Sequence, residues 1–212
     1  MKFTNADGIK IVYNLIAVIQ ENRQYLSDID GAIGDGDHGI NMSKGFTLVQ
    51  NEIKGKELNL TDGLGIISKT LMNKIGGSMG PLYGSIFLGM QLAVKNKEDI
   101  TDEVIIDMFN KAYDNIKLIS PAKPGDKTLV DVLDPAVNIL NGEYTKTKDI
   151  VHTLNMCKKA STEGMLATKN MQAKIGRASR LGEKSIGHQD AGSTSCSLLI
   201  NSICDTCMEL LK

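Results

Sequence analysis

The stretch IKIVYNLIAVI, residues 9–19, decides the fold class. Its apolar residues Ile9, Val12, Tyr13, Ile16 and Ile19 recur at spacings of three and four, which is the period of one face of an α-helix. The same spacing recurs along the chain, and it predicts eight helices, approximately over 5–26, 38–54, 61–75, 81–95, 101–118, 128–141, 147–170 and 192–211.

No alternating strand pattern interrupts these segments, and the chain has 4 prolines and 4% aromatic residues. These features argue against a sheet. We therefore predict a single all-α domain spanning residues 1–212, folded as an eight-helix antiparallel up-and-down barrel or bundle.

Composition restricts the partners of the chain. Its 212 residues are 42% hydrophobic and 23% charged, and the formal net charge is -1. Such a balance is typical of a globular protein and gives no reason to expect a nucleic acid or an anionic membrane as partner. No apolar run approaches the roughly 20 residues that cross a bilayer, and the N-terminus lacks the features of a signal peptide. We expect a cytoplasmic protein.

The four cysteines favour packing over metal binding. Cys204 and Cys207 form a CxxC inside an apolar run, with no second pair and no neighbouring histidine. Two thiolates do not complete a tetrahedral zinc site, so we interpret the pair as neighbours on a helix. Cys157 and Cys196 stand alone and are expected to be buried as small apolar side chains.

Glycine-rich polar segments fall at 31–39, 76–84, 121–128 and 176–192. In the predicted helix order these are the first, third, fifth and seventh connections. Odd-numbered connections of an up-and-down bundle lie at the same end. We therefore expect the four segments to form one functional face.

The first of these segments contains GDGDHG, residues 34–39, with Asp30 just upstream. The string matches a dinucleotide-binding fingerprint, but no buried strand precedes it and no βαβ unit follows. An EF-hand is excluded because Phe46 stands where a bidentate glutamate belongs. Asp30, Asp35 and Asp37 together suit a hard cation such as Mg²⁺ or Ca²⁺, while turn and helix-cap roles remain the alternative.

The other segments carry possible anion contacts. GGSMGPLYG, residues 76–84, has the composition of a phosphate-binding nest at a helix start, or of a tight turn between helices. In PGDKTLVD, residues 124–131, Lys127 could reach a phosphate, while its neighbours could cap a helix. In the long segment 176–195, Arg177 could donate to a phosphate and Asp190 could bind a base amino group or cap the last helix.

Together, GDGDHGINM, GGSMGPLYG, PGDKTLVD and GRASRLGEKSIGHQDAGSTS resemble, in this order and spacing, the nucleotide-binding L subunits of dihydroxyacetone kinases over essentially the whole chain. The resemblance implies an eight-helix barrel with ADP or ATP and two Mg²⁺ ions at one end. It implies metal ligands at Asp30, Asp35 and Asp37. It implies nucleotide contacts at His38, Gly39, Ile40, Asn41, Ser78, Met79, Ser120, Leu129, Arg177, Asp190, Ala191 and Gly192. Met79 departs from the small or hydroxyl residue expected at that position. We therefore expect its backbone N–H, and not its side chain, to contact the nucleotide.

The length adds an expectation about the donor. A free-standing L chain resembles the bacterial form served by the phosphoenolpyruvate phosphotransferase system. In that form bound ADP is a retained cofactor: the phosphohistidine of an M subunit recharges it to ATP, and the γ-phosphoryl group passes to dihydroxyacetone on a K subunit. No catalytic residue is assigned to this chain. The alternatives are a non-catalytic regulatory module that binds a transcription factor or a K-like partner, and an L-like domain of a fatty-acid or other small-molecule kinase.

Overall fold

The structure, a computed structural model, describes residues 1–211. The α-helices of this part of the chain are α1 (Ile9–Glu21), α2 (Arg23–Ile33), α3 (His38–Ile53), α4 (Leu60–Lys74), α5 (Met79–Val94), α6 (Asp102–Ile119), α7 (Val130–Thr147), α8 (Ile150–Ala167) and α9 (Ala191–Leu210). Two 3₁₀ helices, η1 (Thr168–Asn170) and η2 (Arg177–Ser185), lie between α8 and α9.

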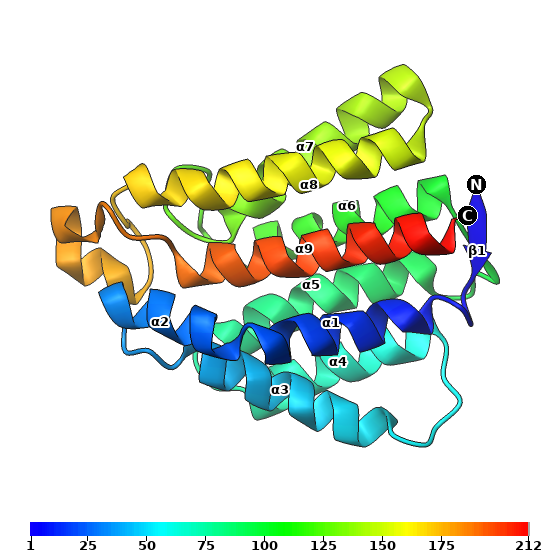
Figure 1. The fold of residues 1–212 in the computed structure, drawn as a ribbon, viewed down its shortest axis with the longest axis horizontal. Coiled ribbons are helices and arrows are strands. Elements are labelled where there is room, and N and C mark those ends of the chain that lie inside the picture. Colours follow the sequence, from blue (N-terminus) through cyan, green and yellow to red (C-terminus); the bar gives the residue numbers. More distant parts are fainter. Residues whose placement is uncertain (212) are drawn as a thin grey trace.

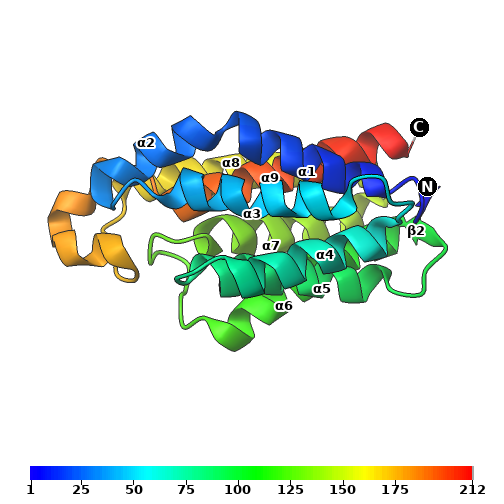
Figure 2. The same cartoon turned by 90° about the horizontal axis from the view of Figure 1, so that it is seen from below.

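The helices run along a common axis and form a closed barrel (Figures 1 and 2). Helices α3 to α9 pack largely on their neighbours in sequence. Helix α1 packs on both α9 and α3, which closes the ring. One apolar cluster fills the centre, with Phe46 and Phe87 meeting edge to face at 6.1 Å between ring centroids. The predicted all-α antiparallel barrel is confirmed.

The helix count differs from the prediction because the expected first helix is broken at Asn22. The Asn22 side chain donates to the carbonyl of Val18 at 2.8 Å, and the Asn22 N–H donates to the same carbonyl at 3.2 Å. A side chain that competes for a backbone acceptor favours a helix end. The chain then forms α2, of which Leu26 and Ile33 are buried. Most of the other residues of α2 are polar, so its apolar stripe is narrow.

The prediction that the chain forms no sheet was wrong, because the structure contains one small two-stranded sheet. Strands β1 (Lys2–Thr4) and β2 (Asp99–Thr101) pair antiparallel, and Phe3 faces Ile100 in the register. Both of these side chains are buried. Three residues are too few to show an alternating pattern, so the pairing leaves no local signature.

Two helix ends also differ from expectation. Helix α7 continues through Gly142 to Thr147 and stops where Lys148 adopts a left-handed conformation with φ of 53°. The predicted seventh helix ends as the 3₁₀ turn η1. Helix α4 begins after Asn59, which forms a capping box with Asp62.

The four glycine-rich connections lie at one end of the barrel, as predicted. Residues of the connections 34–37, 75–78, 120–129 and 171–190 line one cavity there. The N-terminus, β1 and the C-terminal end of α9 lie at the opposite end (Figure 1). Helices α3, α5, α7 and α9 all begin at the cavity end, so the positive ends of four helix dipoles are directed toward it.

Within residues 1–211, none of the helices combines the length and the apolar character needed to cross a bilayer. All four cysteines are buried thiols, and Cys204 and Cys207 lie in the C-terminal half of α9, as expected for packing residues. Burial raises the pKa of the Cys207 thiol to about 12, which keeps it protonated.

Candidate functional site

The cavity at the glycine-rich end has a volume of about 1010 Å³. Most of the residues predicted for the site line it: Asp30, Asp35, Asp37, His38, Asn41, Ser78, Met79, Ser120, Leu129, Arg177, Asp190, Ala191 and Gly192. Gly39 and Ile40 are not among its lining residues. Gly39 is buried against α2, and the side chain of Ile40 is 47% exposed.

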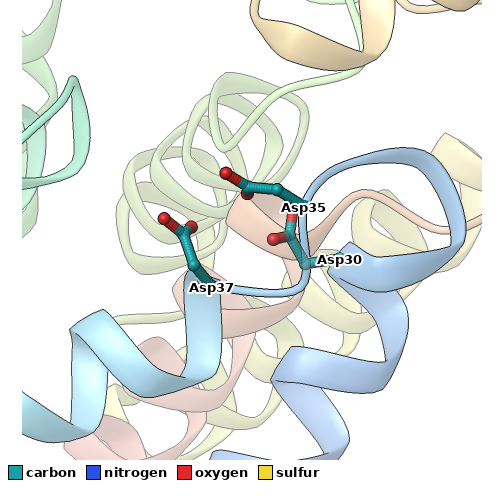
Figure 3. A group of neighbouring side chains, drawn as sticks. All are labelled: Asp30, Asp35 and Asp37. Carbon is teal, nitrogen blue, oxygen red and sulfur yellow. The ribbon is translucent and has the colours of Figure 1, made fainter.

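Three carboxylates converge on this cavity. Asp30 lies in the last turn of α2, Asp35 in the loop that follows, and Asp37 directly before α3. One ligand oxygen from each lies within 4.8 Å of the others. Figure 3 shows the three carboxyl groups gathered around the connection from α2 to α3. Asp30 therefore projects from a helix, where the sequence suggested a loop.

The cap role proposed for Asp37 falls instead to Asp30. Asp37 makes no side-chain hydrogen bond at the start of α3. The N–H of His38, the first residue of α3, donates to Oδ2 of Asp30 at 3.2 Å. The carboxylate of Asp37 is thus left available to a ligand, while Asp30 links the end of α2 to the start of α3.

Two glycines allow the turn that brings the carboxylates together. Gly36 has a φ of 74°, which side chains other than glycine rarely adopt. Gly34 passes so close to Asp30 that an added Cβ would lie 2.5 Å from its Oδ1. Substitution at Gly34 would therefore displace the carboxylate that the loop encloses.

The chemistry of this donor set suits a divalent cation. Two carboxylates about 4 Å apart repel each other by roughly 1 kcal/mol in water, and by more where the dielectric constant is lower. Carboxylate oxygens are the ligands that Mg²⁺ and Ca²⁺ prefer. In the structure the guanidinium of Arg177 pairs with Asp35 and lies 3.8 Å from Oδ2 of Asp37. The residues present therefore fit a cation at this position.

A buried hydrogen-bond network supports the cavity wall. Nε2 of His38 lies 2.8 Å from the Ser195 hydroxyl, which lies 2.6 Å from the Tyr83 hydroxyl. Tyr83 also lies within hydrogen-bond distance of the Gly192 carbonyl, at 2.8 Å. Burial lowers the pKa of His38 to about 4 despite the nearby Asp30, so the ring is neutral at physiological pH.

The His38–Ser195 pair has the residue types of a nucleophile and its base, but not the accessibility. Ser195 is fully buried. Its hydroxyl is also within hydrogen-bond distance of the Ala191 carbonyl, at 3.1 Å. A nucleophile must reach a substrate, so we assign this pair to the cavity wall.

Asp190 caps the last helix. Its Oδ2 accepts from the N–H of Ser193 at 2.6 Å, as one of the two sequence readings suggested. Burial raises the pKa of Asp190 to about 6, even though this hydrogen bond and the nearby Lys127 favour the charged form. The Asp190 carboxyl group, which lines the cavity, therefore gains or loses its proton near pH 6.

Lys127 does not stand free to bind a phosphate. Its side chain is 1% exposed. The ammonium group donates to three backbone carbonyls, at Met171, Ser185 and His188. The suggestion that Lys127 reaches a phosphate is therefore corrected: a buried ammonium has three donors, and all three are used.

Sequence reasoning missed the roles of Tyr83, Ser195 and Lys127. Tyr83 and Ser195 are 112 positions apart, and the acceptors of Lys127 are backbone carbonyls 44 to 61 positions away. Tyr83 and Lys127 each stand inside a glycine-containing motif, which is the signal that could have drawn attention to them.

The barrel with one glycine-rich, carboxylate-bearing end is the architecture of a known class. The sequence matches the DAK2 domain over residues 32–205, and the chain belongs to this family. It is 40% identical to the ADP-binding subunit DhaL of PEP-dependent dihydroxyacetone kinase 1 from Listeria innocua, over 89% of each chain. It is 34% identical to the corresponding subunit DhaL of Escherichia coli, over 88% of this chain and 89% of that subunit. The resemblance drawn from the four motifs is confirmed.

A solved structure has the same fold. The dihydroxyacetone kinase from C. freundii, crystallised in complex with AMP-PNP and Mg²⁺, superimposes with a TM-score of 0.69 and 20% sequence identity. The similarity covers 97% of this chain and 34% of that kinase. The longer kinase therefore contains this barrel as one part.

Proposed function

We propose that this chain is the nucleotide-carrying subunit of a phosphoenolpyruvate-dependent dihydroxyacetone kinase. The observation that carries the proposal is the group of three carboxylates in a cavity onto which four helix N-termini open. Helix N-termini favour anions, whereas carboxylates repel them. A Mg²⁺-bound nucleotide satisfies both, because its phosphates suit the helix ends and its metal suits the carboxylates. The names of the relatives, ADP-binding subunits, support the same ligand.

In this proposal Asp30, Asp35 and Asp37 hold two Mg²⁺ ions. Once bound, these ions neutralise charge on the β- and γ-phosphates in the transition state. The first turn of α5, at Ser78 and Met79, offers backbone N–H groups to a phosphate. Further contacts come from residues on the other walls of the cavity: His38, Asn41, Ser120, Leu129, Arg177, Asp190, Ala191 and Gly192.

The chain passes on a phosphoryl group without a covalent intermediate of its own. A phosphohistidine on an M subunit transfers its phosphoryl group to bound ADP, giving histidine and ATP. The γ-phosphoryl group then passes to dihydroxyacetone on a K subunit, giving dihydroxyacetone phosphate, a proton and ADP, which stays bound. The chain contributes positioning and electrostatics, which dominate phosphoryl transfer. The acceptor of the substrate proton is assigned to the partner that holds dihydroxyacetone.

Reconstitution tests this function. Purified chain is mixed with K and M subunits, the general phosphotransferase proteins, phosphoenolpyruvate and dihydroxyacetone, and product formation is followed. We expect turnover that depends on the chain and on one equivalent of nucleotide, without added ATP. Bound ADP without turnover would instead support a non-catalytic regulatory module. Turnover only with stoichiometric ATP would contradict the phosphoenolpyruvate route.

A further inference from the structure

The segment of residues 171–188, which we call the arginine loop, leaves and rejoins the barrel at one place. The N–H of Gly187 donates to the carbonyl of Lys169 at 2.8 Å. The N–H of Ala173 donates to the Ser185 hydroxyl at 2.9 Å. The chain segments that enter and leave the loop are therefore hydrogen-bonded to each other, as in an Ω-loop with a closed neck. Arg177 stands beyond this neck and reaches Asp35.

Lys127 lies inside the neck. Its ammonium donates to the carbonyl of Met171 on the entering side, at 3.1 Å. It donates to the carbonyls of Ser185 and His188 on the leaving side, the latter at 2.7 Å. One buried cation thus joins both sides of the loop.

The residue that supplies this cation is itself rigidly held. Lys127 has a φ of 63°, a left-handed conformation. On either side of it, the N–H groups of Gly125 and Thr128 both donate to the buried Asp131 carboxylate. The connection between α6 and α7 therefore presents the ammonium from a fixed point on the barrel.

We propose that Lys127 is a positioning residue, which closes the neck of the arginine loop and thereby places Arg177 at the carboxylate group. The effect on the nucleotide rests on the proposed function, in which Arg177 contacts the phosphates. All three donors of Lys127 are used by carbonyls, so apart from its charge near Asp190 its effect on the nucleotide runs through Arg177. Replacing the ammonium by an apolar group leaves the buried Ser185 carbonyl and the part-buried Met171 and His188 carbonyls without this donor, so the neck loosens.

The neck is tested first in nucleotide-free protein, by hydrogen exchange at the amides of Ala173 and Gly187. The variant is Lys127→Met, and the matched control is Lys184→Met, which removes an exposed lysine from the same loop. We expect exchange at both amides to accelerate about tenfold or more in Lys127→Met, with α5 unchanged and the control like wild type. Unchanged exchange, or loss of the helical circular-dichroism signal of the whole barrel, would overturn the proposal.

Rescue provides a second variant. Lys127→Ala removes the side chain beyond Cβ, and n-propylammonium supplies the missing atoms. We expect n-propylammonium to restore slow exchange at Ala173 and Gly187, whereas n-propanol does not. Failure of the amine to slow the exchange would count against a role for the cation.

Positioning through Arg177 is tested by a double-mutant cycle on Mg²⁺·ADP binding. Loss of a charge-assisted contact predicts that Arg177→Gln and Lys127→Met each weaken binding about 10- to 100-fold. The double variant should bind Mg²⁺·ADP no less tightly than the single variant with the lower affinity, because both changes remove the same contact. Additive losses would show that Lys127 acts independently of Arg177 and would overturn the proposal. If wild-type protein binds no nucleotide, the proposed function fails, while the exchange experiment still decides the role of the neck.

Discussion

Gly39 sets the distance between the two helices that carry the carboxylates. A Cβ built at Gly39 would lie 2.0 Å from the carbonyl oxygen of Arg23 in α2, and ordinary contact begins at 3.4 Å. Gly39→Ala therefore requires α2 and α3 to separate locally by about 1.4 Å. The neighbouring atoms are Arg23 and Ser27 backbone and the short Ser27 side chain, which cannot swing away as a long side chain could.

This substitution is expected to cost both stability and ligand binding. Overpacking against backbone costs about 3 kcal/mol, and the higher helix propensity of alanine returns about 1 kcal/mol. The net loss of about 2 kcal/mol lowers Tm by roughly 4–8 °C in a chain of this size. The hydrogen bond from the His38 N–H to Asp30, 3.2 Å long, would exceed bonding distance, and Asp37 would move away from Asp30. We expect at least about tenfold weaker Mg²⁺·ADP binding.

Thermal denaturation and isothermal titration calorimetry measure the two effects. Gly142→Ala is the matched control, because a Cβ there meets nothing within 4 Å on a helix. The control should gain about 0.5–1 kcal/mol. If Gly39→Ala keeps its Tm within 1 °C of wild type, or binds Mg²⁺·ADP normally, the argument from helix spacing is refuted.

Three further substitutions probe the cavity. Asp37→Asn should weaken Mg²⁺·ADP binding at least about 100-fold by calorimetry while leaving Tm unchanged or slightly higher, since Asp37 makes no cap bond; normal binding would remove it from the metal group. Asp190→Asn keeps the cap but cannot ionise. Because burial raises the pKa of Asp190 from 3.8 to about 6, the fold favours the neutral carboxyl, and wild type loses this contribution as pH rises through 6. In nucleotide-free protein the variant should match wild type near pH 4 and be more stable by up to about 3 kcal/mol at pH 8, as measured by denaturant titration; a pH-independent difference contradicts this. Tyr83→Phe removes the hydroxyl shared by Ser195 and Gly192 and should cost about 1–3 kcal/mol, so an unchanged Tm would argue against the network.

The fold could be predicted because helical periodicity is a local property. Ile16 and Ile19 mark the buried face of α1 from their spacing alone. The gathering of the glycine-rich segments at one end followed from counting connections in an up-and-down barrel. The three aspartates lie within eight positions, so their convergence required no knowledge of distant contacts.

The features that the sequence did not predict arise from side chains that compete with the backbone for a hydrogen bond, or from contacts between residues far apart in the chain. The helix break at Asn22 arises because a side chain competes with the backbone for one carbonyl, which composition does not reveal. The β1–β2 pair joins segments 97 positions apart through three residues each. The motif around Lys127 shows a lysine in a glycine-containing connection, which suggested a phosphate contact. It does not show which groups the ammonium binds in the fold. Its partners are backbone carbonyls, which have no sequence signature.

The central claim is that the carboxylate group holds the nucleotide through divalent metal. The most direct measurement is calorimetric titration of nucleotide-free protein with ADP, once with Mg²⁺ and once with EDTA. We predict binding that is at least about 100-fold tighter with Mg²⁺, and that the difference disappears when Asp30, Asp35 and Asp37 are all replaced by asparagine. Equal affinity for ADP in Mg²⁺ and in EDTA would contradict the account.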